Sequence, residues 1–262
     1  NIDAAAQFLH HGYILEPYSI FNDTFKLKAG HYLEVDIKKR EIKQLQYWSL
    51  EASYKKPKYD LTESEAVSET DKLLKSACEY RMISDVPTGI FLSGGYDSSA
   101  VAAVLQSNRS NKIKTFTIGF KEKGYDEAPF AKKVAKYLGT DHTEYYCTAK
   151  DALDIIPTLS EIYDEPFGDN SAIPTILVSK LARQDVTVSL SADAGDEVFA
   201  GYSKYDRALK YYNLSKKIPD IIQRPMLSSM NNIDPSKIPF SSNIYNFTTR
   251  YEKMKNILNR IA

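Results

Sequence analysis

A short apolar run breaks at two consecutive glycines and continues into small polar residues in the segment Ile90-Phe91-Leu92-Ser93-Gly94-Gly95-Tyr96-Asp97-Ser98-Ser99-Ala100. The apolar run predicts a buried strand over 89–92, and the small residues over 98–106 recur at helical spacing. The two glycines allow a sharp turn and a close approach of the backbone to a ligand, because no Cβ intervenes. The segment therefore predicts a strand, a tight loop and a helix.

The same order of strand, loop and helix recurs up to about residue 213. Further strands are predicted over 113–120, 142–147 and 186–190, and helices over 127–138 and 171–183. Gly139 is expected to end the first of these helices in a left-handed conformation. Buried strands that alternate with helices predict an α/β fold, an open doubly wound parallel sheet with helices on both faces.

The chain upstream of this region predicts a hairpin and a long helix. Alternating apolar and polar residues over 29–37 and 42–48 favour a small β-hairpin. Thr62 and Glu65 form a capping box at the start of a helix, and its predicted apolar stripe includes Val67, Leu73 and Cys78.

Composition and charge exclude several classes of protein. The 262 residues include 34 basic and 34 acidic side chains, so the net charge is zero and nucleic acid is not an expected partner. No apolar run approaches the roughly 20 residues that span a bilayer, so no membrane partner is expected. Two cysteines are too few for a disulfide framework, which fits a reducing compartment, and we expect a cytoplasmic protein.

The loop over 93–99 has the chemistry of a phosphate site. The serine hydroxyls and the N–H groups at the start of the following helix are donors for anionic oxygens. Asp97 would repel phosphate unless a divalent cation bridges the two, so Mg²⁺ is expected. The segment matches neither the Walker A loop nor the Gly-x-Gly-x-x-Gly fingerprint.

A second polar loop follows the strand predicted over 186–190. Three acids, Asp193, Asp196 and Glu197, lie within five positions. Alone, such a segment is more typical of a solvated acidic turn. In a doubly wound sheet, however, ligands bind at the carboxyl ends of the strands. Asp97 and Asp196 are therefore candidates to hold one Mg²⁺ ion between them.

These two loops carry a resemblance to a known family. Ser-Gly-Gly-x-Asp-Ser-Ser resembles the pyrophosphate loop of N-type ATP pyrophosphatases, whose fold is of the adenine nucleotide alpha hydrolase type. Together with the segment 191–197, it resembles the C-terminal synthetase domain of glutamine-hydrolysing asparagine synthetases. The segments 138–142 and 165–169 are also similar to segments of that family. Residues 1–50 resemble its linker to a glutaminase domain.

The resemblance implies roles for individual residues. ATP would be bound by the loop residues and by backbone around two strands and the second loop, namely Phe91, Ser93, Gly94, Gly95, Asp97, Ser98, Ser99, Ile118, Ser191 and Ala192. Asp97 and Asp196 would bind Mg²⁺, and Asp193 corresponds to the acid proposed to act near the attacking amine. Where the family usually has glycine, this chain has Ala192 and Ala194. If those positions need a positive φ, each alanine would cost about 1 kcal/mol or more.

The resemblance also implies a domain organisation. Residues 1–60 would be a linker and hairpin joined to a glutaminase domain of the same parent chain, and residues 61–262 an ATP-pyrophosphatase synthetase domain truncated at its C-terminal end. The family's catalytic lysine would lie beyond Ala262, so we expect a fragment. The oligomeric state stays open, with a homodimer among the options.

The implied activity is asparagine biosynthesis by a ligase. The aspartate side-chain carboxylate would be activated by ATP as an acyl-adenylate, releasing pyrophosphate, and ammonia from glutamine would displace AMP. One alternative is an amidotransferase of the same family that acts on another carboxylate. The other is a non-catalytic nucleotide-binding domain.

Overall fold

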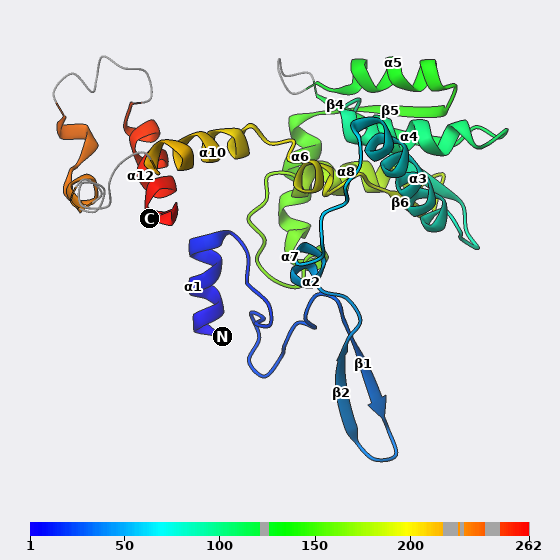
Figure 1. Cartoon of the computed structure of the whole chain (residues 1–262). Helices are drawn as coiled ribbons and strands as arrows, with labels where there is room; N and C mark the ends of the chain where they lie inside the picture. Colours follow the sequence, from blue (N-terminus) through cyan, green and yellow to red (C-terminus); the bar gives the residue numbers. More distant parts are fainter. Residues whose placement is uncertain (121–125, 217–224, 226–227, 239–246, 262) are drawn as a thin grey trace. The chain divides into compact units, whose positions relative to one another are not determined.

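The computed structural model describes residues 1–120, 126–216, 225, 228–238 and 247–261. The chain divides into two compact units, Asn1–Ala192 and Asp193–Ala262, which are described separately below. Figure 1 follows the chain through both.

A four-stranded sheet forms the centre of the first unit. Its order is β5-β4-β3-β6, and every neighbouring pair is parallel. The strands are β3 (Thr88–Phe91), β4 (Lys114–Phe120), β5 (Asp141–Cys147) and β6 (Val188–Leu190). The chain builds outward from β3 to β5 and then returns to the other side of β3 to form β6. This reversal places the carboxyl ends of β3 and β6 side by side, as in a doubly wound sheet.

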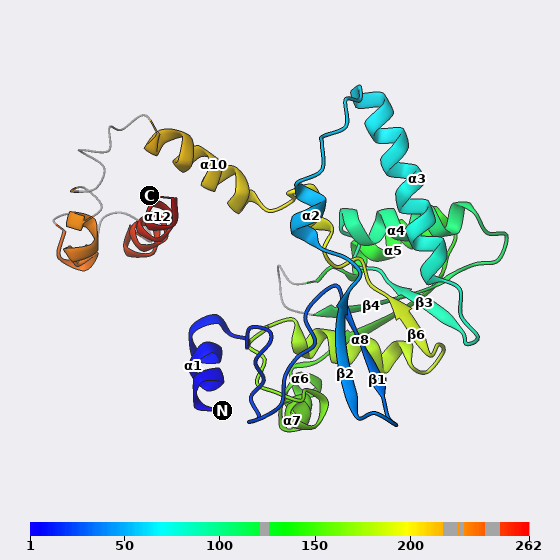
Figure 2. The same ribbon diagram turned by 60° about the horizontal axis from the view of Figure 1, so that its bottom comes forward.

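Helices cover both faces of this sheet, as predicted. In Figure 2, α4 and α5 lie above the sheet and α8 lies below it. α3 packs against α4, and α6 against α8. The helices of this unit beyond the hairpin region are α3 (Glu63–Arg81), α4 (Tyr96–Ser107), α5 (Ala128–Leu138), α6 (Ala149–Ile155), α7 (Leu159–Ile162) and α8 (Ala172–Ala182), with a 3₁₀ turn at Ile156–Thr158.

The core lies on both sides of the sheet because strand residues alternate between its faces. On one face, Ile90 of β3 packs with Cys78 and Leu105 of α3 and α4. On the other, Phe116 of β4 packs with Ala182 at the end of α8. The chain therefore sandwiches the sheet between two helical layers, and the predicted fold class is confirmed.

The helix boundaries follow the signals in the sequence. The Thr62–Glu65 capping box opens α3, and Gly139 ends α5 at φ 74°. Pro157 lies in the 3₁₀ turn that separates α6 from α7, as expected for a residue that interrupts helices.

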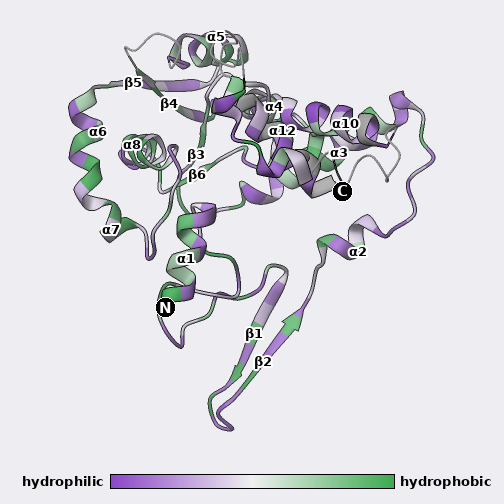
Figure 3. Cartoon of the chain, turned by 90° about the vertical axis from the view of Figure 1, so that its left-hand side faces the viewer, coloured by the Kyte–Doolittle hydropathy of each residue, from purple (hydrophilic) through white to green (hydrophobic). Residues whose placement is uncertain are grey.

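A two-stranded antiparallel hairpin precedes the α/β region, also as predicted. It pairs β1 (His31–Asp36) with β2 (Glu41–Gln46) and is followed by α2 (Leu50–Tyr54). Hydrophobic and hydrophilic residues are intermixed along both strands (Figure 3). Val35 lies opposite Ile42, and both are more than half exposed.

One helix of this region, α1 (Ile2–His11), was not predicted. The Asn1 side chain accepts hydrogen bonds from the N–H groups of Asp3 and Ala4, and Gly12 ends the helix at φ 81°. Both are ordinary start and stop signals. They are easily missed because α1 has a single buried residue, Ala4.

Two predictions of burial are wrong in part. Val67 and Leu73 of the predicted α3 stripe are 64% and 61% exposed, because the side of α3 that packs on the core carries Leu74 and Cys78 instead. Val188 of β6 is 41% exposed. β6 is an outer strand, so it has a neighbour on one side only.

The second unit contains α9 (Gly195–Phe199), α10 (Ser203–Ser215), a 3₁₀ turn at Pro235–Lys237 and α12 (Phe247–Ile261). α12 packs against α10 and against the 3₁₀ turn. None of the described helices in either unit is both long enough and apolar enough to cross a membrane.

The burial pattern gives a matched test of the core. Leu105→Ala should lower the free energy of unfolding by roughly 2–5 kcal/mol, because Leu105 is fully buried and truncation leaves a cavity. Leu73→Ala, the same change on the exposed side of α3, should cost under about 1 kcal/mol. Urea unfolding of both variants measures the difference, and equal losses would contradict this assignment of the core.

Candidate functional site

The loop between β3 and α4 is pressed against helix α5. Gly94 has φ 82°, and a Cβ there would lie 2.5 Å from the backbone N of Ala131 and 2.7 Å from the carbonyl carbon of Phe130. Glycine is therefore required twice at this position, once by conformation and once by space. This contact fixes the path of the loop.

Serine side chains hold the loop from inside. The Ser98 hydroxyl lies 2.9 Å from the Ser93 hydroxyl and accepts a hydrogen bond from the Ser93 N–H at 3.2 Å. The Ser93 hydroxyl also accepts from the N–H of Gly95. Ser98 is 8% exposed, and its hydroxyl bonds to groups of the loop itself, which stabilises the loop conformation.

Helix α4 begins at this loop without a side-chain cap. Gly95 is its N-cap residue and supplies no side-chain cap; the Ser93 hydroxyl accepts from the N–H of Gly95 itself and not from the N–H groups of the turn that follows. The first turn of a helix presents unpaired N–H groups and the positive end of the helix dipole. Asp97 lies in this turn. The arrangement sets unpaired N–H donors beside a carboxylate, which is the donor set expected for a phosphate that carries a divalent cation.

A cavity of about 320 Å³ opens beside the loop, at the carboxyl ends of β3 and β4. Three of the predicted nucleotide-binding residues line it, namely Phe91, Ser93 and Ile118. Ser171 and Thr175 line it too and were not predicted. They belong to the start of α8, which the topology brings under the ends of the strands and which no local sequence signal assigns to the site.

The second loop leaves the sheet at the same edge. Ile90 of β3 pairs with Leu190 of β6, so Ser191 and Ala192 continue the strand that neighbours β3 where Leu92 and Ser93 leave it. Neither residue lines the cavity described above. Their predicted contact with ATP stays a prediction.

Ser99 is placed differently from the other serines. Its hydroxyl oxygen is buried and has no hydrogen-bond partner among the described residues. Ser99 lines a separate pocket of about 380 Å³ between α4 and α5, together with Lys133 and Tyr137. The structure therefore brings Ser93 and Ser98 together in the loop, whereas Ser99 lies behind it.

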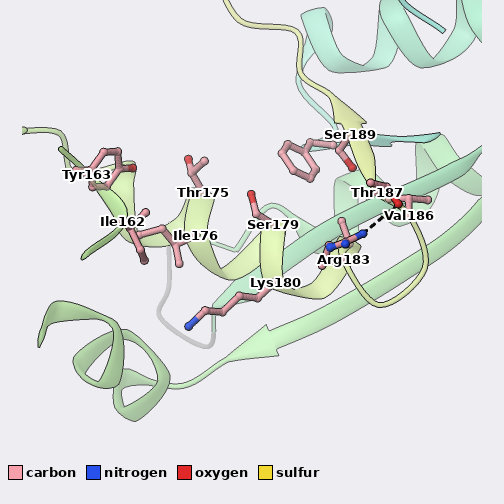
Figure 4. A pocket seen from close by; sticks show the side chains of 12 residues that line it. Ile162, Tyr163, Thr175, Ile176, Ser179, Lys180, Arg183, Val186, Thr187 and Ser189 are labelled. Carbon is pink, nitrogen blue, oxygen red and sulfur yellow. Dashed lines mark hydrogen bonds between the residues drawn. The ribbon is translucent and has the colours of Figure 1, made fainter. Parts of the chain in front are cut away.

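A larger groove of about 640 Å³ lies on the α8 face of the sheet (Figure 4). Phe91 and Thr175 line both this groove and the smaller cavity. Within the groove, Arg183 donates a hydrogen bond to the Thr187 hydroxyl at 3.0 Å, drawn as a dashed line in Figure 4. Phe91 thus lies at the boundary between the candidate nucleotide cavity and the larger groove.

The three acids of the second loop belong to the second unit. Asp193 precedes α9, and Asp196 and Glu197 lie in its first turn. The Tyr202 hydroxyl donates to Glu197, and this bond, aided by burial, raises the pKa of Tyr202 to about 12. The phenol is therefore protonated at neutral pH. The predicted Mg²⁺ site pairs Asp97 with Asp196, one residue from each unit, and it stays a prediction.

The two alanines that replace glycines differ in backbone conformation. Ala194 has φ 73°, in the left-handed region. The other non-glycine residues with positive φ in the described part of the chain are Asp23, Arg40 and Ala200, so Ala192 does not share this strain. Only one of the two positions therefore carries the cost expected for alanine in place of glycine.

Comparison with known proteins identifies the family. The asparagine synthase family model matches residues 69–260. The putative glutamine-hydrolysing asparagine synthetase 2 of Methanocaldococcus jannaschii is 46% identical over 226 residues, which cover 85% of this chain and 42% of that protein. The glutamine-hydrolysing asparagine synthetase 1 of Bacillus subtilis is 34% identical over 167 residues, 61% of this chain and 26% of that protein.

A third relative has a different name. Amidase ChyE of Penicillium rubens is 30% identical over 217 residues, 73% of this chain and 30% of that protein. The chain thus spans less than half the length of each of these relatives. It belongs to the asparagine synthase family, and the residues that the family model matches include both loops described above.

The contact at Gly94 can be tested against a second glycine of similar conformation. Gly94→Ala should cost more than about 3 kcal/mol, because the methyl group overlaps the α5 backbone in addition to the strain of a positive φ. Gly139→Ala should cost only about 1–2 kcal/mol, since φ is 74° and nothing lies within 4 Å of the new Cβ. Denaturant unfolding compares the two, and equal costs would refute the role of α5.

The strain at Ala194 gives a prediction of opposite sign. Ala194→Gly should stabilise the protein by roughly 0.5–1 kcal/mol, seen as a rise in melting temperature of roughly 1–4 °C, because glycine adopts φ 73° without penalty. Ala192→Gly should be neutral or destabilising, since only chain entropy changes. A rise with Ala192→Gly and not with Ala194→Gly would contradict the assignment.

Proposed function

We propose that the protein carrying this chain makes asparagine from aspartate, ATP and ammonia derived from glutamine. The aspartate side-chain carboxylate attacks the α-phosphate of ATP, the bond to the β-phosphate breaks, and pyrophosphate leaves. Ammonia then attacks the acyl carbon and AMP departs. The observation that carries the proposal is the uncapped start of α4 behind the Gly94 turn, at the edge where β3 and β6 end together.

The residues of the first unit divide the work of binding ATP. The N–H groups at the start of α4 and the Ser93 hydroxyl bind the departing pyrophosphate, where charge builds up in the transition state. The cavity lined by Phe91 and Ile118 holds the adenosine. Asp97 binds Mg²⁺, and we retain Asp196 as its second protein ligand. When bound, Mg²⁺ neutralises the phosphate charge and stabilises the leaving group.

The remaining roles follow from the family. Asp193 acts near the attacking amine. Residues 1–60 join the synthetase domain, residues 61–262, to a glutaminase domain of the parent chain, and the exposed apolar residues of the hairpin favour packing against such a neighbour. Both cysteines are free and buried, which favours a cytoplasmic location. A homodimer is retained as the assembly to be tested.

An amidotransferase acting on a different carboxylate is the second candidate. It is favoured by Ala192 and Ala194, where the family usually has glycine, and by the relative named as an amidase. A panel of carboxylic acids in the full-length protein distinguishes it from the first. Aspartate-dependent consumption of ATP supports asparagine synthesis, and consumption with another acid alone supports the rival.

Binding of ATP to the chain tests the phosphate site directly. Asp97→Asn should weaken binding in Mg²⁺ about tenfold or more, because a cation ligand is lost. In EDTA the same variant should bind ATP as well as or better than the wild type, because a carboxylate that repels phosphate is gone. Isothermal titration in both buffers measures the two constants.

Asp185→Asn is the matched control. Asp185 pairs with Lys114 at 3.2 Å, at the opposite edge of the sheet where β4 begins. Its loss should leave both binding constants unchanged. Unchanged ATP binding by Asp97→Asn in Mg²⁺ would overturn the assignment of the phosphate site. If the wild-type chain binds ATP but the full-length protein consumes no ATP with any carboxylic acid, a non-catalytic nucleotide-binding domain is favoured.

A further inference from the structure

The short helix α9 is bounded by two strained residues. Ala194 precedes it at φ 73° and Ala200 follows it at φ 55°. A left-handed backbone is strained for alanine, so both ends of this five-residue helix carry strain. Strain of this kind persists only where surrounding contacts enforce it. The contacts of the residues that follow Ala200 are therefore informative.

The first contact is made by Gly201. Its N–H donates to the carbonyl oxygen of Asp196 at 2.9 Å. A Cβ at Gly201 would overlap the Asp196 carboxylate oxygen Oδ1. Gly201 is not among the glycines with positive φ, so its conformation is open to other residues. Glycine is needed here for space, and the space is taken by the Asp196 carboxylate.

The second contact is made by Tyr202. Its hydroxyl donates to Glu197 Oε1 at 2.8 Å. The Nζ of Lys204 lies 4.0 Å from the centre of the Tyr202 ring, and the Tyr205 ring lies edge-on at 5.7 Å. These neighbours restrict the ring, so the hydroxyl is held in place. Tyr202 thus fixes the direction of the Glu197 carboxylate.

Asp196 and Glu197 are adjacent in one turn of helix, so their carboxylates would repel each other if both were left to rotate. We propose that Gly201 and Tyr202 are positioning residues of the acidic loop, Gly201 by making room for the Asp196 carboxylate and Tyr202 by holding Glu197 away from it. The loop then presents Asp196 as its cation ligand. This last step rests on the proposed function; the positioning itself does not.

Backbone hydrogen exchange of the nucleotide-free chain tests the positioning. Tyr202→Phe keeps the ring and removes the bond to Glu197, so amides over 195–200 should exchange at least threefold faster. Glu197→Ala should do the same, and the double variant should be no faster than either single one. Glu197→Gln keeps an oxygen acceptor and should restore slow exchange. Tyr205→Phe removes a neighbouring hydroxyl and should have no effect. Wild-type exchange in Tyr202→Phe would overturn the proposal.

Cation dependence of nucleotide binding tests the consequence for Asp196. Gly201→Ala and Tyr202→Phe should each raise the Mg²⁺ concentration for half-saturation roughly five- to tenfold, with the ATP affinity in EDTA unchanged. A role confined to folding would not separate these two constants. Unchanged half-saturation in both variants would overturn the role toward Asp196. Failure of the wild-type chain to bind ATP would overturn the proposed function, and hydrogen exchange would still decide the positioning.

Discussion

The close approach of Gly94 to the backbone of α5 is the constraint on which the candidate site depends. With less than 3 Å between a hypothetical Cβ and three atoms of α5, the loop after β3 has one path available. That path buries Ser98 and places Gly95 at the start of α4. The N–H groups of the first turn are left for a ligand because no described side chain caps them. The packing of a loop against a neighbouring helix thus exposes the donors that we propose bind phosphate.

The sheet topology sets what surrounds this site. β3 is central, so the loop that follows it has β4 on one side and β6 on the other. The β4 side contributes Ile118 and the start of α8, which line the open cavity of about 320 Å³ beside the loop. On the β6 side, Ser191 and Ala192 continue the strand that pairs with β3. Burial of Ile90 and Phe116 on opposite faces stabilises this arrangement, and Phe116 also lines the cavity beside the loop.

Much of the fold was predictable because its signals are local. The capping box at Thr62, the C-cap at Gly139 and the double glycine at 94–95 each act within a few residues of the structure that they specify. The topology followed from the alternation of strands and helices. The loop over 93–99 and the acidic segment were located from the sequence because each directly follows a predicted strand.

What the sequence did not predict depends on distant contacts or on their absence. Leu73 and Val188 are exposed because no other element packs over them, and the spacing of apolar residues in the sequence does not show which side of an element is covered. Ser99 has the same residue type and setting as Ser98, yet one turns into the loop and the other behind it. Ser171 and Thr175 reach the cavity through the fold. The backbone strain at Ala194, which Ala192 does not share, could be recognised only from the backbone angles of the structure.

The transfer of oxygen from the acid to AMP tests the central claim most directly. The full-length protein is incubated with ATP, Mg²⁺, ammonia and aspartate labelled with ¹⁸O in its side-chain carboxylate, and the nucleotide is analysed by mass spectrometry. Attack of the carboxylate on the α-phosphate predicts AMP that carries one ¹⁸O atom, together with unlabelled pyrophosphate. Formation of ADP with ¹⁸O in inorganic phosphate would contradict the account.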